Sequence, residues 1–195
     1  MSKSRIMLAM SLLATALLTA SCKQARTIYF VPIGIQVSVP VDEMAAFYRT
    51  RFKLNVETLP LLGFDVSAYD PTRRQLVAEE LIAMIKRGYP KQGEDRNAIL
   101  IGITDGDMYL RGMNWRFGFS YREDDRFAVV SSARMNPVNF GEPADGELLQ
   151  MRLRKMITKN IGILYYKKEP SDDPKSVLYN NILGLEELDN MSEEF

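Results

Sequence analysis

The chain has 195 residues, with 25 lysines and arginines against 25 acidic residues, no histidine and one cysteine, Cys22. The lack of histidine excludes Ser-His and Cys-His nucleophiles and histidine-based zinc sites. One cysteine excludes an intramolecular disulfide and a cysteine-cluster metal site. The length and the apolar fraction of 46% indicate one globular domain with its own core. Carboxylate chemistry, a bound cofactor or no chemistry at all remain open.

The N-terminus has the three parts of a secretory signal peptide. Lys3 and Arg5 precede an apolar run from Ile6 to Leu18, and small residues lead to Cys22. This run is shorter than the roughly 20 residues that a permanent membrane span needs. The residues LTASC at 18–22 resemble the bacterial lipobox, in which the signal is cut before a cysteine that carries lipid. We therefore expect a lipoprotein-type signal peptide over 1–21 and lipidation of Cys22; a conventional signal peptide near a free cysteine is the alternative.

The residues after this cysteine predict where in the cell the protein is located. Residues 22–27 are predicted to be a lipidated tether, and residues 28–195 a single domain. Lys23 follows Cys22, and the resemblance to sorted bacterial lipoproteins implies the outer membrane, with the domain facing the periplasm. The balance of charges argues against a nucleic-acid partner. The expected partners are the membrane, through the lipid, and a peptide or another envelope protein.

The first half of the domain alternates between strand and helix patterns. We predict strands over 28–37 and 55–59 and a helix over 41–53. Asp70-Pro71 is predicted to open a second helix, with the aspartate as its cap, that ends near Gly88. The apolar run from Ala98 to Ile103 is typical of a buried central strand.

The second half predicts a hairpin followed by helices. Strands are expected over 116–121 and 127–132, a helix over 147–160 that Gly162 ends, and a short acidic helix over 185–191. Trp115, Phe117, Phe119 and Tyr121 alternate with a period of two, as in an aromatic binding edge or one face of a sheet. The whole pattern predicts a single compact domain of the mixed α/β class.

Two long stretches carry a resemblance to a known family. They are "ILIGITDGDMYLRGMNWRFGFS" with "FAVVSSARMNPVNFG", and the C-terminal "KMITKNIGILYY" with "SVLYNNILGLEELDNM". In order and residue type they are similar to archaemetzincins, zinc metallopeptidases of the metzincin clan. The resemblance implies a metzincin-like fold with an active-site-type helix and a short C-terminal helix.

The family's chemistry rests on the motif H-E-x-x-H-x-x-G-x-x-H. Its histidines bind zinc, and its glutamate is the general base that acts on the metal-bound water. When the motif is aligned on Gly162, Lys155, Lys159 and Tyr165 stand at the three ligand positions and Met156 stands at the base. Protonated lysines repel a divalent cation, and methionine cannot carry a proton. We therefore predict a vestigial cleft, no catalytic residue, no metal and no cofactor, although the family implies zinc.

Other polar groups leave alternatives open. Arg152, Lys155 and Lys159 share one helix face and are candidates for binding a carboxylate or a phosphate, or for a solvated face paired with Asp172, Asp173 or the acids of the last helix. Asp105 and Asp107 are candidates for acid/base work or calcium binding, but their place after a buried strand favours a turn.

Three functions are thus weighed for the domain. The first is an envelope lipoprotein that binds peptides or proteins, or acts as a scaffold, without catalysis. The second is a hydrolase that works with carboxylates (Glu79, Glu80, Asp105 or Asp107) or with metal ligands supplied by a partner. The third is a structural lipoprotein whose cleft is filled.

Overall fold

The computed structural model describes residues 26–195, so the predicted signal peptide and Cys22 lie outside the described residues. The main sheet has the strand order β2-β1-β5-β8-β7. Three neighbouring pairs, β1 with β2, β1 with β5 and β5 with β8, are parallel, and β7 runs antiparallel to β8 at the edge. These strands are β1 (Thr27–Ile33), β2 (Val56–Thr58), β5 (Ala98–Thr104), β7 (Ser120–Glu123) and β8 (Phe127–Ser131).

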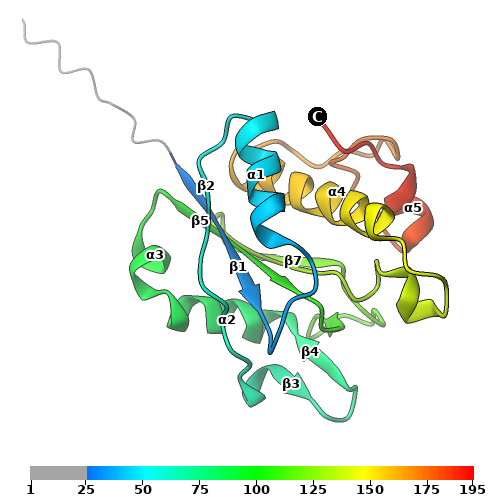
Figure 1. Cartoon of the computed structure of the whole chain (residues 1–195), viewed down its shortest axis with the longest axis horizontal. Coiled ribbons are helices and arrows are strands. Elements are labelled where there is room, and N and C mark those ends of the chain that lie inside the picture. Colours follow the sequence, from blue (N-terminus) through cyan, green and yellow to red (C-terminus); the bar gives the residue numbers. More distant parts are fainter. Residues whose placement is uncertain (1–25) are drawn as a thin grey trace, which may run out of the picture.

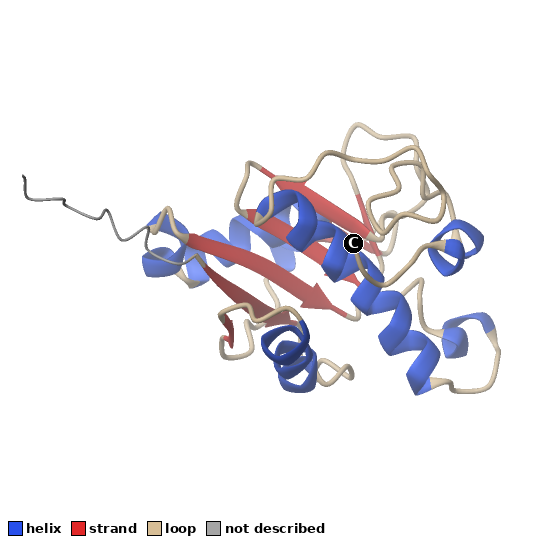
Figure 2. Ribbon diagram, turned by 90° about the horizontal axis from the view of Figure 1, so that it is seen from above, coloured by secondary structure: helices blue, strands red, loops and turns tan. Residues whose placement is uncertain are grey.

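Helices cover both faces of this sheet (Figures 1 and 2). One face packs against α1 (Val41–Arg51) and α4 (Gly146–Leu164), and the other packs against α2 (Ala78–Gly88). Every residue of β5 and β8 is buried, which explains why the run at 98–103 is continuously apolar. The expected mixed α/β domain is confirmed.

Smaller elements complete the chain. A second sheet has the order β3-β4-β6. The remaining elements are β3 (Tyr69–Asp70), β4 (Gln75–Val77), β6 (Met108–Tyr109), α3 (Pro90–Glu94), α5 (Leu185–Asn190) and two 3-10 turns, η1 (Val66–Ala68) and η2 (Pro137–Phe140). None of the helices within 26–195 is long and apolar enough to cross a membrane.

The predicted helix start at Asp70-Pro71 is wrong. Asp70 ends β3, and its Oδ1 accepts hydrogen bonds from the backbone N–H groups of Thr72 and Arg73. Its Oδ2 accepts the hydroxyl hydrogen of Tyr109 at 2.8 Å. The carboxylate therefore stabilises a turn and a contact distant in sequence, and α2 begins only at Ala78.

The predicted end of the long helix at Gly162 is also wrong. Asp145 caps the start of α4 by accepting from the backbone N–H of Leu148, and the helix continues to Leu164. Lys167, with a φ of 55°, then turns the chain away. Gly162 therefore lies inside the helix. An added Cβ at this position would be 2.5 Å from the ring of Phe195 and 2.8 Å from Leu178, which explains why the residue is a glycine. The glycine thus permits a close approach of the C-terminal segment.

The predicted strand over 116–121 is shorter than expected, since β7 begins at Ser120. The alternation of aromatic residues also breaks there. Phe117 and Phe119 pack into the core on the α4 side, whereas Tyr121 packs on the α2 side. Tyr121 therefore does not share a face with the other two.

Candidate functional site

Helix α4 carries the side chains at the predicted site, and it lies buried between the sheet and the C-terminal segment (Figure 1). Arg152, Lys155 and Lys159 are only 6%, 3% and 5% exposed. The face they share is thus not solvated. Each basic group therefore needs a hydrogen-bond acceptor inside the protein. Arg152 and Lys155 find theirs mainly at α5, and Lys159 finds its acceptor beside a pocket.

Helix α5 supplies hydrogen-bond acceptors for Arg152 and Lys155. The guanidinium of Arg152 donates to both carboxylate oxygens of Asp189, at 2.8 and 2.6 Å, and to the backbone oxygen of Met135 at 2.8 Å. The Nζ of Lys155 donates to the backbone oxygens of Leu188 and Asp189, at 3.2 and 2.7 Å. Burial lowers the pKa of Lys155. This part of the α4 face is filled by the chain's own last helix.

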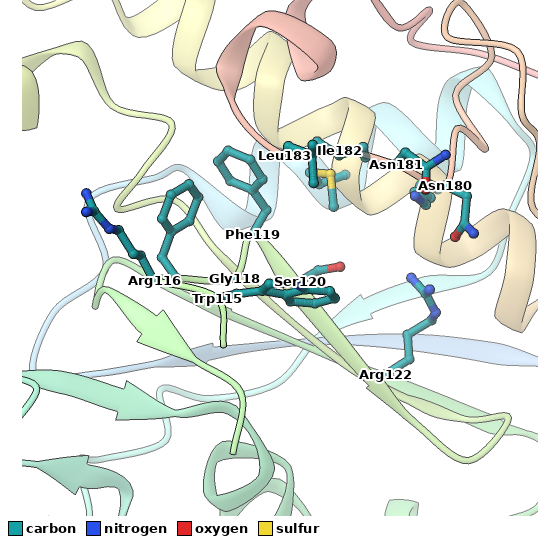
Figure 3. A pocket seen from close by; sticks show the side chains of 13 residues that line it. Trp115, Arg116, Gly118, Phe119, Ser120, Arg122, Asn180, Asn181, Ile182 and Leu183 are labelled. Atoms are coloured by element: carbon teal, nitrogen blue, oxygen red, sulfur yellow. The ribbon is translucent and has the colours of Figure 1, made fainter. Parts of the chain in front are cut away.

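The pocket beside Lys159 has a volume of about 420 Å³ and lies between the edge of the sheet and the segment 180–183 (Figure 3). Trp115 and Arg122 lie on one side of it, and Asn180 to Leu183 lie on the other. Met156 and Lys159 of α4 also line it. The pocket is lined by Trp115, Arg116, Phe117, Gly118, Phe119, Ser120, Arg122, Met156, Lys159, Asn180, Asn181, Ile182 and Leu183.

Lys159 and Arg122 are two of the three cations that line this pocket, and Arg116 is the third. Lys159 donates through Nζ to the backbone oxygen of Tyr179, and Arg122 donates to the side-chain oxygen of Asn160 at 3.1 Å. Burial, together with repulsion from Arg122, lowers the pKa of Lys159 to about 8. Burial also lowers the pKa of Arg122. Within the described part of the chain, neither cation forms an ion pair with a carboxylate.

Hydrogen bonds from Arg73 and Gln75 fix the backbone of the aromatic wall of the pocket, the segment that carries Trp115, Phe117 and Phe119. Arg73 donates to the backbone oxygens of Trp115 and Arg116, at 3.0 and 3.2 Å. The side-chain amide of Gln75 donates to the same oxygen of Arg116 at 2.8 Å. These bonds fix the backbone from which the indole of Trp115, 54% exposed, projects. The wall is therefore positioned before any ligand arrives.

The four residues predicted to form a vestigial cleft (Lys155, Met156, Lys159 and Tyr165) do not lie together in one cavity. Met156 and Lys159 line the pocket, and Lys155 lies beneath α5. Tyr165 packs against Tyr166, with ring centroids 4.9 Å apart, and Tyr166 in turn packs against Phe195. Of the three candidate anion-binding residues, only Lys159 lines the pocket.

The acidic candidates each have a structural partner. Asp105 accepts from the backbone N–H of Ser38 and from the Ser132 hydroxyl, and Asp107 pairs with Arg134. Glu79 accepts from the backbone N–H of Arg111, and Glu80 pairs with the side chain of the same arginine. None of these four acids lines the pocket described above.

Sequence reasoning missed Arg122 and the segment 180–183. Arg122 lies one residue beyond the predicted strand over 116–121, and Asn180 and Asn181 are ordinary loop residues in sequence. One signal was available: in a strand that begins at Ser120, Arg122 shares a face with that serine. The segment 180–183 reaches the pocket only through tertiary packing.

Comparison with known proteins gives consistent relatives. An archaemetzincin from Thermococcus kodakarensis is 32% identical over 145 residues, which cover 72% of this chain and 76% of that protein. An archaemetzincin from Pyrococcus furiosus is 30% identical over 174 residues, which cover 82% of this chain and 84% of that protein. No protein-family model matches the chain.

Solved structures share the fold. A zinc-dependent peptidase from Methanocorpusculum labreanum superposes with a TM-score of 0.70 at 22% identity, covering 86% of this chain and 95% of its own. An archaemetzincin from Archaeoglobus fulgidus, complexed with malonate, gives a TM-score of 0.67 at 23% identity, covering 87% of this chain and 94% of its own. The predicted metzincin-like fold is confirmed.

These relatives correct one prediction. The absence of a cofactor was predicted, but the relatives are archaemetzincins and one solved neighbour is a zinc-dependent peptidase, so zinc is the cofactor that the family implies. The side chains at the aligned ligand positions, as the structure holds them, do not fit the ion: the Nζ atoms of Lys155 and Lys159 donate to carbonyl oxygens. Over residues 26–195, no group of three or more His, Cys, Asp or Glu could hold a metal. By sequence and by fold, the chain belongs to the archaemetzincin family.

Proposed function

We propose that this protein is an envelope lipoprotein of the archaemetzincin family that binds peptide segments beside β7 without cleaving them. The pocket that contains Met156 and Lys159 is the observation that carries this proposal. The cleft is not filled along its whole length, because α5 covers Arg152 and Lys155 but leaves Lys159 at a hollow. A hollow beside a sheet edge suits an extended peptide.

The chemistry of the pocket supports binding over catalysis. A thioether at Met156 cannot take a proton from water, and three residues that line the pocket, Lys159, Arg122 and Arg116, are cations. A general base that activates water must accept a proton, and no carboxylate of the described residues lines this pocket. Hydrogen bonding, stacking on aromatic rings and attraction of negative charge are what these residues offer.

The test is an assay of binding and cleavage on the purified full-length protein in detergent, with zinc supplied. We expect unstructured peptides to bind, as measured by fluorescence anisotropy, and to be recovered intact by mass spectrometry. A trace peptidase in the preparation is controlled for by a matched preparation of the Lys159→Glu variant. Cleavage that a chelator abolishes and that the variant lacks would overturn the proposal of a non-catalytic role.

The lipid anchor and the division of the chain form the second part of the proposal. Residues 1–21 are the signal peptide, residues 22–27 are the tether that carries lipid on Cys22, and residues 28–195 are the domain. This is supported by the single cysteine at the end of an apolar leader and by β1, which begins at Thr27. Lys23 supports the outer membrane, facing the periplasm.

Cell fractionation tests the anchor. The wild-type protein should sediment with outer membranes and incorporate a labelled fatty acid, and Cys22→Ser should lose the label. If Cys22→Ser kept the label, the lipid would be attached elsewhere and this part of the proposal would fail.

A further inference from the structure

The pocket next to α4 combines two features that point to one chemical group. Two of its three cations, Lys159 and Arg122, come from facing elements, α4 and β7, and each has one hydrogen-bond acceptor among the described residues. A lysine has three donor hydrogens and a guanidinium has five, so both have donors to spare. No carboxylate of the described residues neutralises them through an ion pair.

A buried lysine and a half-buried arginine without an anion are costly, because burial removes hydration that a neutral partner does not replace. The lowered pKa values of both groups express that cost. A bound anion would offset it, and the geometry of a guanidinium suits a planar carboxylate. The pocket is therefore complementary to a negative charge at the Lys159 end.

Much of the remaining lining of the pocket is apolar or aromatic. Phe117 and Phe119 lie edge to face, with ring centroids 5.1 Å apart, and Trp115, Ile182 and Leu183 continue the lining. Asn180 and Asn181 add polar side chains on the side of the pocket opposite Arg122 (Figure 3). The volume of about 420 Å³ falls in the usual range for ligand pockets of roughly 300–1,000 Å³. It is large enough for an aromatic side chain together with a carboxylate.

We propose that the ligand enters by its C-terminus: the terminal carboxylate of a peptide binds Lys159 and Arg122, and its last, apolar or aromatic side chain packs against Phe117, Phe119 and Trp115. This inference rests on the proposed peptide-binding function and specifies which end of the peptide the site recognises. It also assigns a role to Arg122, which the alignment with the family motif did not single out.

The experiment compares ligands that differ only at that end. The full-length protein in detergent is titrated with acetyl-Ala-Ala-Phe as the free acid and as the amide, and with acetyl-phenylalanine, by isothermal calorimetry. A hydrogen bond to a charged carboxylate is stronger than one to a neutral amide, so the free acid should bind at least about tenfold more tightly than the amide.

Variants test whether Lys159 and Arg122 cause the preference for the free acid over the amide. Arg122→Gln and Lys159→Gln should each reduce the ratio of acid to amide affinity about tenfold, whereas Arg122→Lys, which keeps the charge, should retain most of it. Arg87→Gln is the matched control, because Arg87 is an exposed arginine that pairs with Asp65 and does not line the pocket. Its ratio should stay unchanged. Melting curves of all variants show that each is folded.

The outcomes separate the two proposals. Equal binding of acid and amide, or an unchanged ratio in Arg122→Gln, overturns the carboxylate inference and leaves peptide binding in place. Binding of acetyl-phenylalanine without either tripeptide supports a carboxylate site and overturns peptide binding. If none of the three binds, both proposals are wrong.

Discussion

The ion pair between the buried Arg152 and the exposed Asp189 shows how single residues join α4 to α5. Arg152→Met removes a cation that is 6% exposed and makes three hydrogen bonds. Because the Asp189 side chain is 37% exposed and can be rehydrated, the loss should be below the 3–5 kcal/mol of a fully buried pair, at about 2 kcal/mol. Urea unfolding measures it. The control Arg51→Ala breaks an exposed pair with Glu194 and should change little; equal losses in both variants would contradict the argument.

Lys159 predicts a specific dependence of stability on pH. Burial and Arg122 lower its pKa from 10.5 to about 8, so between these pH values the unfolded chain holds a proton that the folded chain has released. The free energy of unfolding therefore rises with pH across this window. The difference in stability between Lys159→Met and the wild type should then shift in favour of the wild type from pH 7 to pH 10. A constant difference would show that Lys159 titrates normally.

Two glycines of α4 give a matched test of how the helix meets the C-terminal segment. In Gly162→Ala the new Cβ meets Phe195 and Leu178, at 2.5 and 2.8 Å, so the clash should outweigh the gain in helix propensity and cost about 1–2 kcal/mol. Gly146→Ala in the first turn of the same helix meets nothing within 4 Å and should be neutral or slightly stabilising. Adding Phe195→Ala should relieve part of the Gly162→Ala loss; no relief would place the strain elsewhere.

The elements show where sequence patterns suffice and where they do not. The run at 98–103 and the periodic helix at 147–160 were predictable, because their burial follows from local apolar patterns. Gly162 and Asp70 were misread because their partners, Phe195 and Tyr109, are distant in sequence. The site was predicted in part: alignment on the family motif found Lys159 and Met156, but Arg122 and the segment 180–183 join them only through tertiary packing.

At the scale of the molecule, the C-terminal segment acts as a wall of the core. Leu188 and Met191 belong to the buried cluster on the α4 side, and α5 supplies the acceptors for Arg152 and Lys155. Deleting residues 184–195 therefore exposes core and removes the α5 acceptors of two buried cations. A loss of about 3–5 kcal/mol is expected, which corresponds to a fall in melting temperature of roughly 10–15 °C for a domain of this size.

The two contributions to that loss can be separated. If unpaired cations cause much of it, the same deletion combined with Arg152→Met and Lys155→Met should recover part of the lost stability, because apolar side chains need no acceptor where the ammonium and guanidinium groups lay. If exposed core alone causes the loss, the combined variant should melt no higher than the simple deletion. A deletion that melts within about 2 °C of the wild type would show that α5 contributes little to the fold, and Arg152 and Lys155 would then need other acceptors than the ones they contact here.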